Sequence, residues 1–327
     1  MALVERQKAW NRDLTANCGL PDHGKPTDAE IGKSLLCVRL GFLYRARVLG
    51  VIADIAQGRD KLRRWSIPPY EVFIDTRNDD LISVLSLYKD GHWIYSADAT
   101  LVRVNPKEFF VETKDYDEGQ QPYEVGRDVL GVGAPALLVS GYTGGAHCCF
   151  NLAILVLGTE FREMQRMDLR DDEIVKIRKP AGGIATMEID DFNYDYWRGP
   201  FSESPAPKIV LSYDAKAGQY AADPTLMRTP LPDLAPLIER ARAAQQEDET
   251  SPNLIPHDVS GPILDLIYGG HLAAAHEFLV DAWTGVAADR DEYWNELTNC
   301  RLRHSHFWPA IAALNGLPAD KPAGSCS

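Results

Sequence analysis

The chain has 327 residues, 45% of them apolar, and 34 Lys and Arg stand against 47 Asp and Glu, a formal net charge of −13. This length predicts two or three folded domains. The excess of acids excludes a nucleic-acid-binding surface, which needs clustered positive charge, and favours a basic partner. The sequence also lacks the run of about 18 apolar residues that a transmembrane helix requires.

Residues 1–62 are predicted to form a helical hairpin. Leu3, Trp10 and Leu14 recur at helical spacing, and residues 35–55 form a second run of periodic apolar positions. The segment between them, residues 17–26, is rich in Gly, Pro, Asn and Asp, which is typical of a loop. The N-terminus itself is polar and lacks the apolar core of a signal peptide.

Residues 63–232 are predicted to form an antiparallel β domain. Short β-branched and aromatic segments alternate with turn residues, and no helix-length amphipathic segment separates them. The strongest hairpin signal is the Asp90-Gly91 dipeptide. A meander, a sandwich or a propeller-like assembly would fit this pattern. The clearest predicted strands are 82–88, 92–95, 101–104, 109–111, 136–140, 150–157, 184–189 and 208–213.

Residues 233–327 are predicted to be helical after a polar linker at 245–256. From Ala243 to Asp289 there is no Lys or Arg, so this part cannot bind phosphate. The fold class is therefore multidomain α+β, with a propeller-like antiparallel centre between a helical hairpin and a helical end. The predicted helices are 234–244, 263–268, 271–283, 290–303 and 306–314.

The six cysteines are Cys18, Cys37, Cys148, Cys149, Cys300 and Cys326, and no CxxC pair suggests a zinc site. An even number is consistent with disulfides, although 15 pairings are conceivable. The preferred set is Cys18–Cys37 and Cys300–Cys326, each closing a local loop. Cys148 and Cys149 are then either buried thiols or bonded to each other. The alternative is six reduced cysteines that fill core space.

The most unusual segment runs from Val139 to Phe150. Its glycines and small hydroxyl residues predict a tight exposed loop between two apolar strands. A thiol nucleophile at Cys148 with His147 as its base is disfavoured, because adjacent strand residues point to opposite faces. A binding or structural role is favoured. The candidate partner-binding residues are Ser140, Gly141, Tyr142, Thr143, Gly144, Gly145 and His147.

Two acidic segments were considered as calcium sites, and calcium is the only cofactor that the sequence suggests. Asp190, Asp191, Asn193 and Asp195 offer oxygen ligands, but the segment lacks the glycine of a sharp ligand turn, so a solvated acidic strand end is favoured. Residues 126–135 have the outline of a calcium loop. There, Leu130 and Val132 stand where further oxygen ligands belong.

The remaining motifs give no support for an enzyme. His271 and His276 are five residues apart, and His304 and His306 are two apart, so neither pair has the i, i+4 spacing of a metal site on one helix face. No GxGxxG, P-loop, HExxH or GxSxG motif occurs. The sequence therefore predicts a protein without catalytic residues.

The N-terminal motifs carry a family resemblance. A Gln7-x-x-Trp10 helix precedes Cys18 and Cys37, and a second helix carries Tyr44-x-x-Arg47. Residues 3–49 therefore resemble the later half of an LprI-type lysozyme-inhibitor domain, without its first helices and first cysteine. The resemblance implies a periplasmic or secreted protein, and we expect a truncated chain whose signal peptide is absent.

The middle of the chain carries a second resemblance. Residues 75–223 are similar to degenerate FG-GAP or VCBS-like propeller repeats, with residues 128–135 in place of the calcium loop. Ser140 to Cys149 is similar to an SGGAHCC segment of exported bacterial proteins. Some periplasmic lysozyme inhibitors insert an SGxxY loop into their target; Ser140-Gly141 matches its start, while Gly144 replaces its tyrosine.

The leading hypothesis is an envelope binding protein of the lysozyme-inhibitor or immunity type. Its loop would enter a glycosidase cleft, where Ser140, Tyr142, Thr143 and His147 would donate hydrogen bonds to the two catalytic carboxylates. The partner would be a basic lysozyme or cell-wall glycosidase. One alternative is a scaffolding protein that binds a protein partner through its helical C-terminal region. Another is an envelope hydrolase that uses His147.

Overall fold

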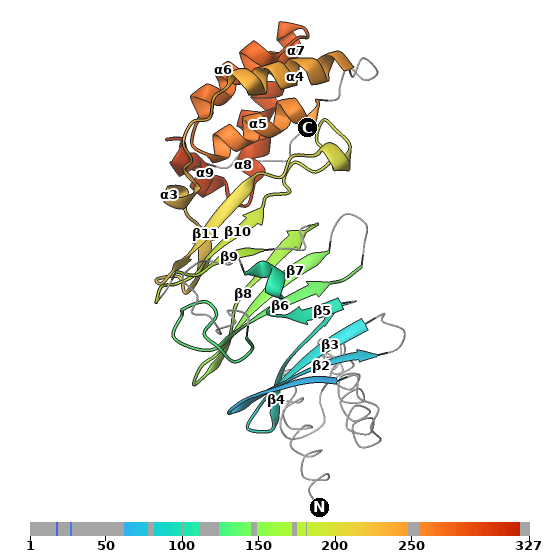
Figure 1. The fold of residues 1–327 in the computed structure, drawn as a ribbon, viewed down its shortest axis with the longest axis vertical. Coiled ribbons are helices and arrows are strands. Elements are labelled where there is room, and N and C mark those ends of the chain that lie inside the picture. The colour runs from blue at the N-terminus through green and yellow to red at the C-terminus, as the bar shows by residue number, and fades with distance from the viewer. Residues whose placement is uncertain are drawn as a thin grey trace, which may run out of the picture. The chain divides into compact units, whose positions relative to one another are not determined.

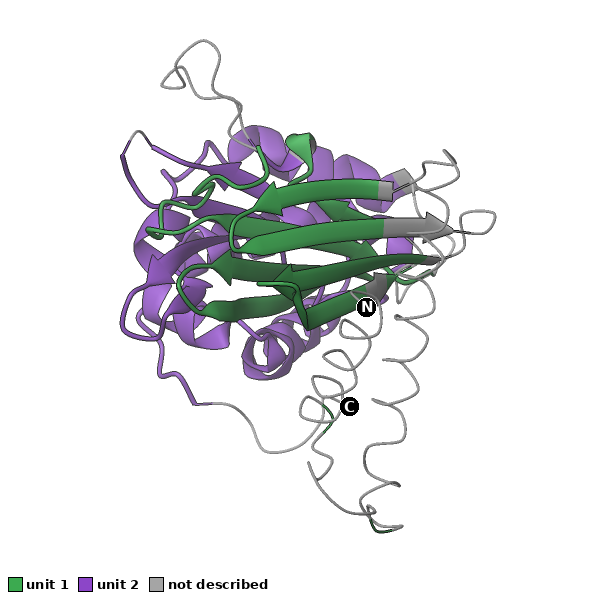
Figure 2. Cartoon of the chain, turned by 90° about the horizontal axis from the view of Figure 1, so that it is seen from below, with its two compact units in different colours: residues 1–107, 119–168 green, residues 108–118, 169–327 purple. Residues whose placement is uncertain are grey.

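The computed structural model describes residues 62–77, 82–99, 101–110, 124–144, 149–171, 175–180, 182–247 and 255–320, together with Cys18 and Thr27. Apart from Cys18, Thr27 and Leu62, the predicted N-terminal hairpin lies outside these residues. The chain divides into two compact units, residues 1–107 with 119–168 and residues 108–118 with 169–327 (Figure 2). The last strands of the predicted β-rich middle fall within the second of these units.

The first unit is built on two antiparallel sheets of four strands each (Figure 1). In both sheets the strands follow one another in chain order, which is a meander. The first sheet contains β1 Leu62–Ile67, β2 Tyr70–Arg77, β3 Ile82–Lys89 and β4 His92–Ala99. The second contains β5 Leu101–Val104, β6 Ala136–Tyr142, β7 Phe150–Leu157 and β8 Phe161–Arg170, whose last two residues belong to the second unit.

The β3–β4 hairpin turns at Asp90 and Gly91, as predicted. Their φ angles are 51° and 80°, the left-handed pair that a two-residue hairpin turn requires. Glycine adopts this conformation without strain, and aspartate does so more readily than most residues. The local sequence therefore determines where this hairpin turns.

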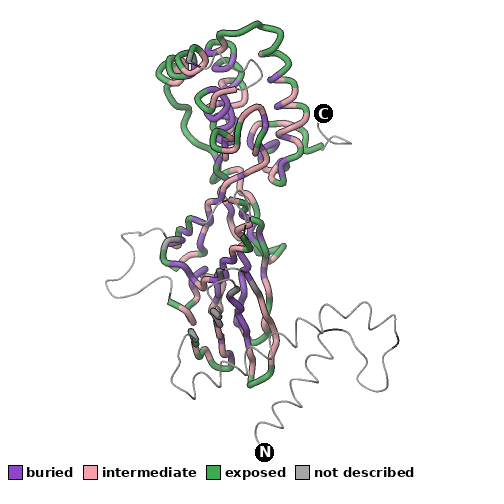
Figure 3. Tube along the Cα trace, turned by 90° about the vertical axis from the view of Figure 1, so that its right-hand side faces the viewer, coloured by how far each residue is buried: buried purple, intermediate pink, exposed green. Residues whose placement is uncertain are grey.

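The two sheets of the first unit share one apolar core. Alternate residues along each strand point to the same face, so every second side chain of β2, β3, β6 and β7 enters it. The buried strand centres are visible in Figure 3. This shared core holds the two meanders together. Its members are Tyr70, Val72, Ile74, Leu85, Leu87, Ala99, Val102, Leu137, Val139, Ala153, Leu155 and Leu157.

Strands β6 and β7 are buried on both faces. Six consecutive residues of β6, from Ala136 to Gly141, are buried, and so are the six residues of β7 from Leu152 to Leu157. This explains why both segments read as nearly continuous apolar runs rather than alternating ones. The hairpin that joins them therefore stands on a firmly packed base.

The prediction of a strand at 109–111 is wrong for its first residue, Phe109, which belongs to a 3-10 turn. Lys107–Phe109 forms a 3-10 turn, η1, directly after Pro106, whose ring fixes φ near the helical value. Phe110 makes a single parallel bridge to Ile177. Phe109 and Phe110 are buried, so the apolar signal reflects their burial rather than a strand.

The second unit combines a third antiparallel sheet with helices (Figure 1). The sheet has the order β12-β11-β10-β9, and α5 packs against α4, α6, α9 and β11. The strands are β9 Lys176–Arg178, β10 Thr186–Asp190, β11 Lys208–Asp214 and β12 Gln219–Ala222. The helices are η2 Phe201–Glu203, α3 Pro224–Met227, α4 Ala235–Glu247, α5 His257–Tyr268, α6 Leu272–Ala282, α7 Ala287–Glu296, η3 Leu297–Arg301, α8 Leu302–His304 and α9 Trp308–Leu314.

The predicted α+β class with antiparallel strands is confirmed. Within the described ranges the three sheets are separate four-stranded meanders, and they close into neither a barrel nor a propeller ring. No described helix combines the length and apolar character needed to cross a membrane.

The core of the first unit predicts a large cost for truncation. Leu85→Ala removes a side chain that is fully buried in this core, so the free energy of unfolding should fall by about 2–5 kcal/mol. Leu226→Ala, at a leucine that is 46% exposed, should change it by less than about 0.5 kcal/mol. Denaturant unfolding of both variants measures the difference. Equal losses would contradict the assignment of Leu85 to the core.

Candidate functional site

The predicted binding loop is shorter than the sequence suggested, because β6 extends to Tyr142. Ser140 lies inside the strand opposite Leu152 and is only 2% exposed. Gly141 is also buried, and a Cβ on it would lie 3.0 Å from Asn151 Oδ1. In this structure the Ser140 hydroxyl therefore cannot reach a partner, contrary to its expected role as a donor.

The rim of the β6–β7 hairpin is formed by Tyr142, Thr143 and Gly144 on one side and by Cys149 and Phe150 on the other. The Tyr142 and Phe150 rings stack with centroids 4.7 Å apart. The Thr143 N–H donates to the Cys149 carbonyl at 2.9 Å. Gly144 and Cys149 both have positive φ angles, 92° and 95°. Gly145 and His147 lie outside the described residues.

Cys18, Cys149 and Cys300 are each disulfide-bonded, so the reduced alternative is wrong for these three. Cys37, Cys148 and Cys326 lie outside the described residues. The pairings Cys18–Cys37 and Cys300–Cys326, and a bond between the neighbours Cys148 and Cys149, therefore stay predictions.

The outlined calcium loop at 126–135 uses its carboxylate internally. Asp128 Oδ1 accepts hydrogen bonds from the N–H groups of Gly131 at 2.7 Å and Val132 at 2.9 Å. Its Oδ2 accepts one from Gly133 N–H at 2.8 Å. Leu130, which stands at a ligand position, is fully buried. The loop is thus stabilised by its own backbone donors, which occupy the oxygens that a cation would need.

The second acidic segment centres on a buried carboxylate. Asp191 Oδ2 accepts short hydrogen bonds of 2.6 Å from both the Tyr268 and the Ser305 hydroxyls. The Tyr194 hydroxyl lies 3.0 Å from that of Tyr268, and Asn193 N–H donates to Asp191 Oδ1 at 3.1 Å. The segment is therefore a buried polar network and not the solvated strand end that was expected.

The side chains of the other three candidate ligands contact three different residues. Asp190 forms an ion pair with Lys208, and Asp195 forms one with Arg170 at 3.0 Å. Asn193 Nδ2 donates to the Arg301 carbonyl at 2.7 Å. Among the described residues no group of three His, Cys, Asp or Glu side chains could hold a metal ion. The four residues do not converge on one point.

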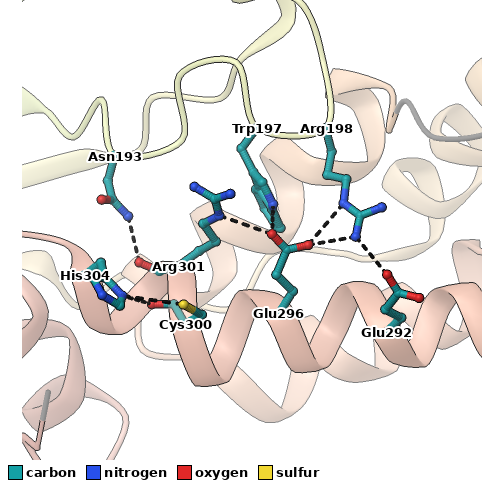
Figure 4. Close-up of polar contacts among 8 residues, drawn as sticks. All are labelled: Asn193, Trp197, Arg198, Glu292, Glu296, Cys300, Arg301 and His304. Atoms are coloured by element: carbon teal, nitrogen blue, oxygen red, sulfur yellow. Dashed lines mark hydrogen bonds and ion pairs between the residues drawn. The ribbon is translucent and has the colours of Figure 1, made fainter. Parts of the chain in front are cut away.

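Glu296 connects the 193–198 loop to the helices (Figure 4). Its Oε1 accepts from Trp197 Nε1 at 2.7 Å and from Arg301 Nε at 3.2 Å. Its Oε2 accepts from both Nη2 and Nε of Arg198, at 2.7 Å and 3.1 Å. Arg198 also reaches Glu292 at 3.2 Å. We call this set of contacts the Glu296 cluster.

The loop held by the Glu296 cluster is locally strained. Tyr196 and Arg198 have φ angles of 58° and 56°, which residues other than glycine rarely adopt. Each such residue costs about 1 kcal/mol or more and persists only where its surroundings enforce it. The hydrogen bond from Ile255 N–H to the Arg198 carbonyl, 2.7 Å long, contributes to this enforcement. The loop is consequently held in one conformation.

Several pKa values in the second unit are displaced from their ordinary range. Burial raises the pKa of Tyr194 and of Tyr268, and the negative charge of Asp191 adds to this. Burial also raises the pKa of Asp195, although Arg170 acts against it. For Glu296, burial tends to raise the pKa, but the hydrogen bonds from Arg198, Trp197 and Arg301 outweigh it, and the pKa is lowered.

The four histidines considered as metal ligands take structural contacts. His271 Nε2 lies 2.8 Å from the Thr229 carbonyl, and the His276 ring lies 4.8 Å from the Trp294 ring. His304 Nδ1 donates to the Cys300 carbonyl at 2.9 Å, four residues earlier. The His306 ring packs edge-on against Phe307. These contacts agree with the spacing argument against a shared metal site.

Sequence reasoning missed the Glu296 cluster and the Tyr268–Asp191–Ser305 network. Glu296 is about a hundred residues from Trp197 and Arg198, and no local pattern joins them. The one available signal in the sequence is the position of Trp197 and Arg198 directly after a run of acidic and aromatic residues. It suggests a loop whose side chains pack against another part of the chain, but it does not identify that part.

No protein-family model matches this chain, and neither a curated protein nor a solved structure matches it.

Two buried tyrosines of the second unit form a matched test of the network. Tyr268→Phe removes the donor to the buried Asp191 carboxylate and should lower the free energy of unfolding by about 1–3 kcal/mol. The buried Tyr293 hydroxyl has no hydrogen-bond partner among the described residues, so Tyr293→Phe should be neutral or stabilising. Denaturant unfolding compares the two variants. A larger loss at Tyr293 would contradict this assignment.

The lowered pKa of Glu296 predicts a pH dependence of stability. Its folded pKa lies below the ordinary value of 4.5, so its contribution is complete above that pH and is lost as the pH falls through the folded pKa. Glu296→Gln should therefore remove part of the acid-induced loss of stability below about pH 4.5. Unfolding curves from pH 7 to pH 3 measure this.

The matched control is Glu292→Gln. The Glu292 side chain is 71% exposed and contacts the same arginine at 3.2 Å, whereas the Glu296 side chain is 16% exposed. An exposed ion pair contributes about 0–1 kcal/mol, so this variant should keep the wild-type pH profile. Identical profiles for all three proteins would show that Glu296 carries no pH-linked stability.

Proposed function

We propose that this protein is an envelope binding protein of the lysozyme-inhibitor or immunity type, and that the β6–β7 hairpin is the element that enters its target. The observation that carries the proposal is the hairpin itself: two strands buried on both faces support a rim at which Thr143 and Gly144 are exposed. A rigid support of this kind lowers the entropic cost of binding.

Because Ser140 is buried, its hydroxyl is no longer among the donors of the proposed mechanism. The Thr143 hydroxyl, the backbone N–H of Gly144 and the His147 side chain are the groups that we propose to face the two catalytic carboxylates of a glycosidase. Glycines allow the backbone to approach a narrow cleft closely. Tyr142 supports the rim through its stacking on Phe150.

The disulfides support the proposed location. Disulfide bonds persist in oxidising compartments such as the bacterial periplasm and the extracellular space, and they are rare in the cytosol. Cys18, Cys149 and Cys300 are all bonded, and they come from both compact units. This supports our proposal that the protein works in the periplasm or outside the cell.

The resemblances support the same proposal. Successive four-stranded antiparallel meanders are the building unit of propeller blades, and each of the three sheets is such a meander. We propose that the sheets descend from FG-GAP or VCBS-like repeats, and that residues 3–49 are the remnant of an LprI-type segment. In this proposal the loop at 126–135 has lost calcium, because Asp128 serves the backbone instead.

The charge supports a basic partner and is distributed unevenly. The first unit carries 19 Lys and Arg against 18 Asp and Glu, a net charge of +1. The second unit carries 15 against 29, a net charge of −14. The acidity therefore belongs to the unit that holds the helices, while the hairpin stands on a nearly neutral one. The scaffolding alternative proposes that the helical region binds a protein partner. The concentration of negative charge in the second unit supports that alternative.

The proposed function predicts inhibition of lysozyme activity. Purified full-length protein should slow the hydrolysis of cell walls by at least one member of a panel of c-type, g-type and bacterial lysozymes, and it should form a complex with that enzyme. Turbidity loss of a cell-wall suspension and light scattering measure the two effects. Absence of inhibition and of complex formation across the panel would overturn the proposal.

Two hairpin variants separate the tip from the strand. Thr143→Ala removes an exposed hydroxyl at the tip and should weaken inhibition, by about three- to tenfold if one hydrogen bond to a carboxylate is lost. Ser140→Ala removes a buried hydroxyl two strand positions away from the rim and should leave the inhibition constant unchanged. The reverse order of effects would show that the tip is not the binding element.

A further inference from the structure

The α6–α7 corner, residues 280–289, exposes apolar side chains on the second unit. Val280 is 39% exposed and Val286 is 65% exposed, and Trp283 between them is half-buried. Val280 and Trp283 are three residues apart at the end of α6, a spacing that makes them neighbours on the helix surface. Trp283 Nε1 donates to the Val286 carbonyl at 3.1 Å, which fixes the backbone of the exposed Val286 beside the Trp283 ring.

The corner is preformed. Gly285 passes so close to Trp283 that a Cβ would lie 3.0 Å from Nε1. The Trp283 ring also lies 6.2 Å from that of Tyr293, which stacks on Trp197 at 5.0 Å. Trp197 in turn donates to Glu296. The aromatic contacts therefore connect the exposed patch to the Glu296 cluster.

Acids outnumber cations around the corner. Glu277, Asp281, Asp289 and Asp291 are exposed there. Two arginines lie beside them: Arg242 donates twice to the neutral Asp281 carbonyl and keeps its charge, and Arg290 pairs with Asp291 at 2.7 Å. An apolar patch with acidic surroundings complements a partner that has the opposite charge and an apolar anchor.

We propose that the α6–α7 corner is the docking surface for a basic protein, which inserts an aliphatic side chain against Val280, Trp283 and Val286 and places Lys or Arg side chains near Asp281 and Asp289. The inference rests on the proposed function, since it supplies the surface by which the acidic second unit would attract a basic lysozyme. It also adds a contact that the nearly neutral hairpin unit does not offer.

The test uses full-length protein and two probes: a basic lysozyme, and a synthetic amphipathic peptide of Lys and Leu that has no glycosidase cleft. Val280→Ser/Val286→Ser removes the apolar contact, and Asp281→Lys/Asp289→Lys reverses the local charge. Each double variant should weaken binding of both probes by about tenfold or more. The charge reversal should also reduce the salt dependence of the association rate.

The matched control is Glu203→Lys/Asp320→Lys, which makes the same change in net charge at two exposed acids of the second unit outside the corner. It should retain most of the binding. Isothermal titration and stopped-flow association, each at low and at 0.15 M salt, measure the affinities and rates. Circular dichroism confirms that every variant is folded, which is expected because the changed side chains are exposed.

The outcomes separate this inference from the proposed function. Weaker binding of the peptide by both corner variants, with no lysozyme inhibited, supports the corner and removes the inhibitor function. Lysozyme inhibition with unchanged binding by the corner variants overturns the corner and keeps the inhibitor function. Equal weakening by the control variant, or no binding of either probe, also overturns the inference, because the effect would then be net charge alone or absent.

Discussion

The carboxylate of Glu296 is the interaction on which the arrangement of the second unit most depends. It accepts hydrogen bonds from Trp197, Arg198 and Arg301, so one side chain joins the loop after β10 to the end of α7 and to η3. Removal of one partner would leave the remaining charged groups half-buried without an opposite charge. The resulting loss of stability would be larger than the net stability that the intact cluster contributes. The strained φ angles of Tyr196 and Arg198 persist because these contacts enforce them.

The same loop carries a second anchor of different chemistry. Asp191 is buried, and its donors within the described part of the chain are neutral hydroxyl and amide groups of Tyr268, Ser305 and Asn193. Three separated parts of the chain, at β10, α5 and α8–α9, thus meet at one carboxylate. A buried network of this kind specifies a single packing of sheet and helices, because other packings would leave the carboxylate without donors.

The sequence predicted the elements whose signals are local. The Asp90-Gly91 turn, the apolar runs of β6 and β7, and the periodic helices α4 to α6 all have such signals. Strand β8 was missed because half of its ten residues, FREMQRMDLR, are charged. Its apolar side chains Met164, Met167 and Leu169 are buried, while four of the five charged residues are exposed. The acidic segment at 188–197 was misread for the converse reason, since the hydroxyl donors to Asp191, on Tyr268 and Ser305, lie 77 and 114 residues away.

The uneven charge changes the meaning of the acidic composition. A net charge of −13 spread over one surface would steer a basic partner toward any part of it, but a first unit near neutrality confines that attraction to the second unit. In the proposed function, the second unit would raise the association rate by electrostatic steering, and the packed base of the β6–β7 hairpin would lower the entropic cost of the final contact. The segment from Gly141 to Phe150 has no Asp or Glu, so in this proposal it would approach catalytic carboxylates without charge repulsion.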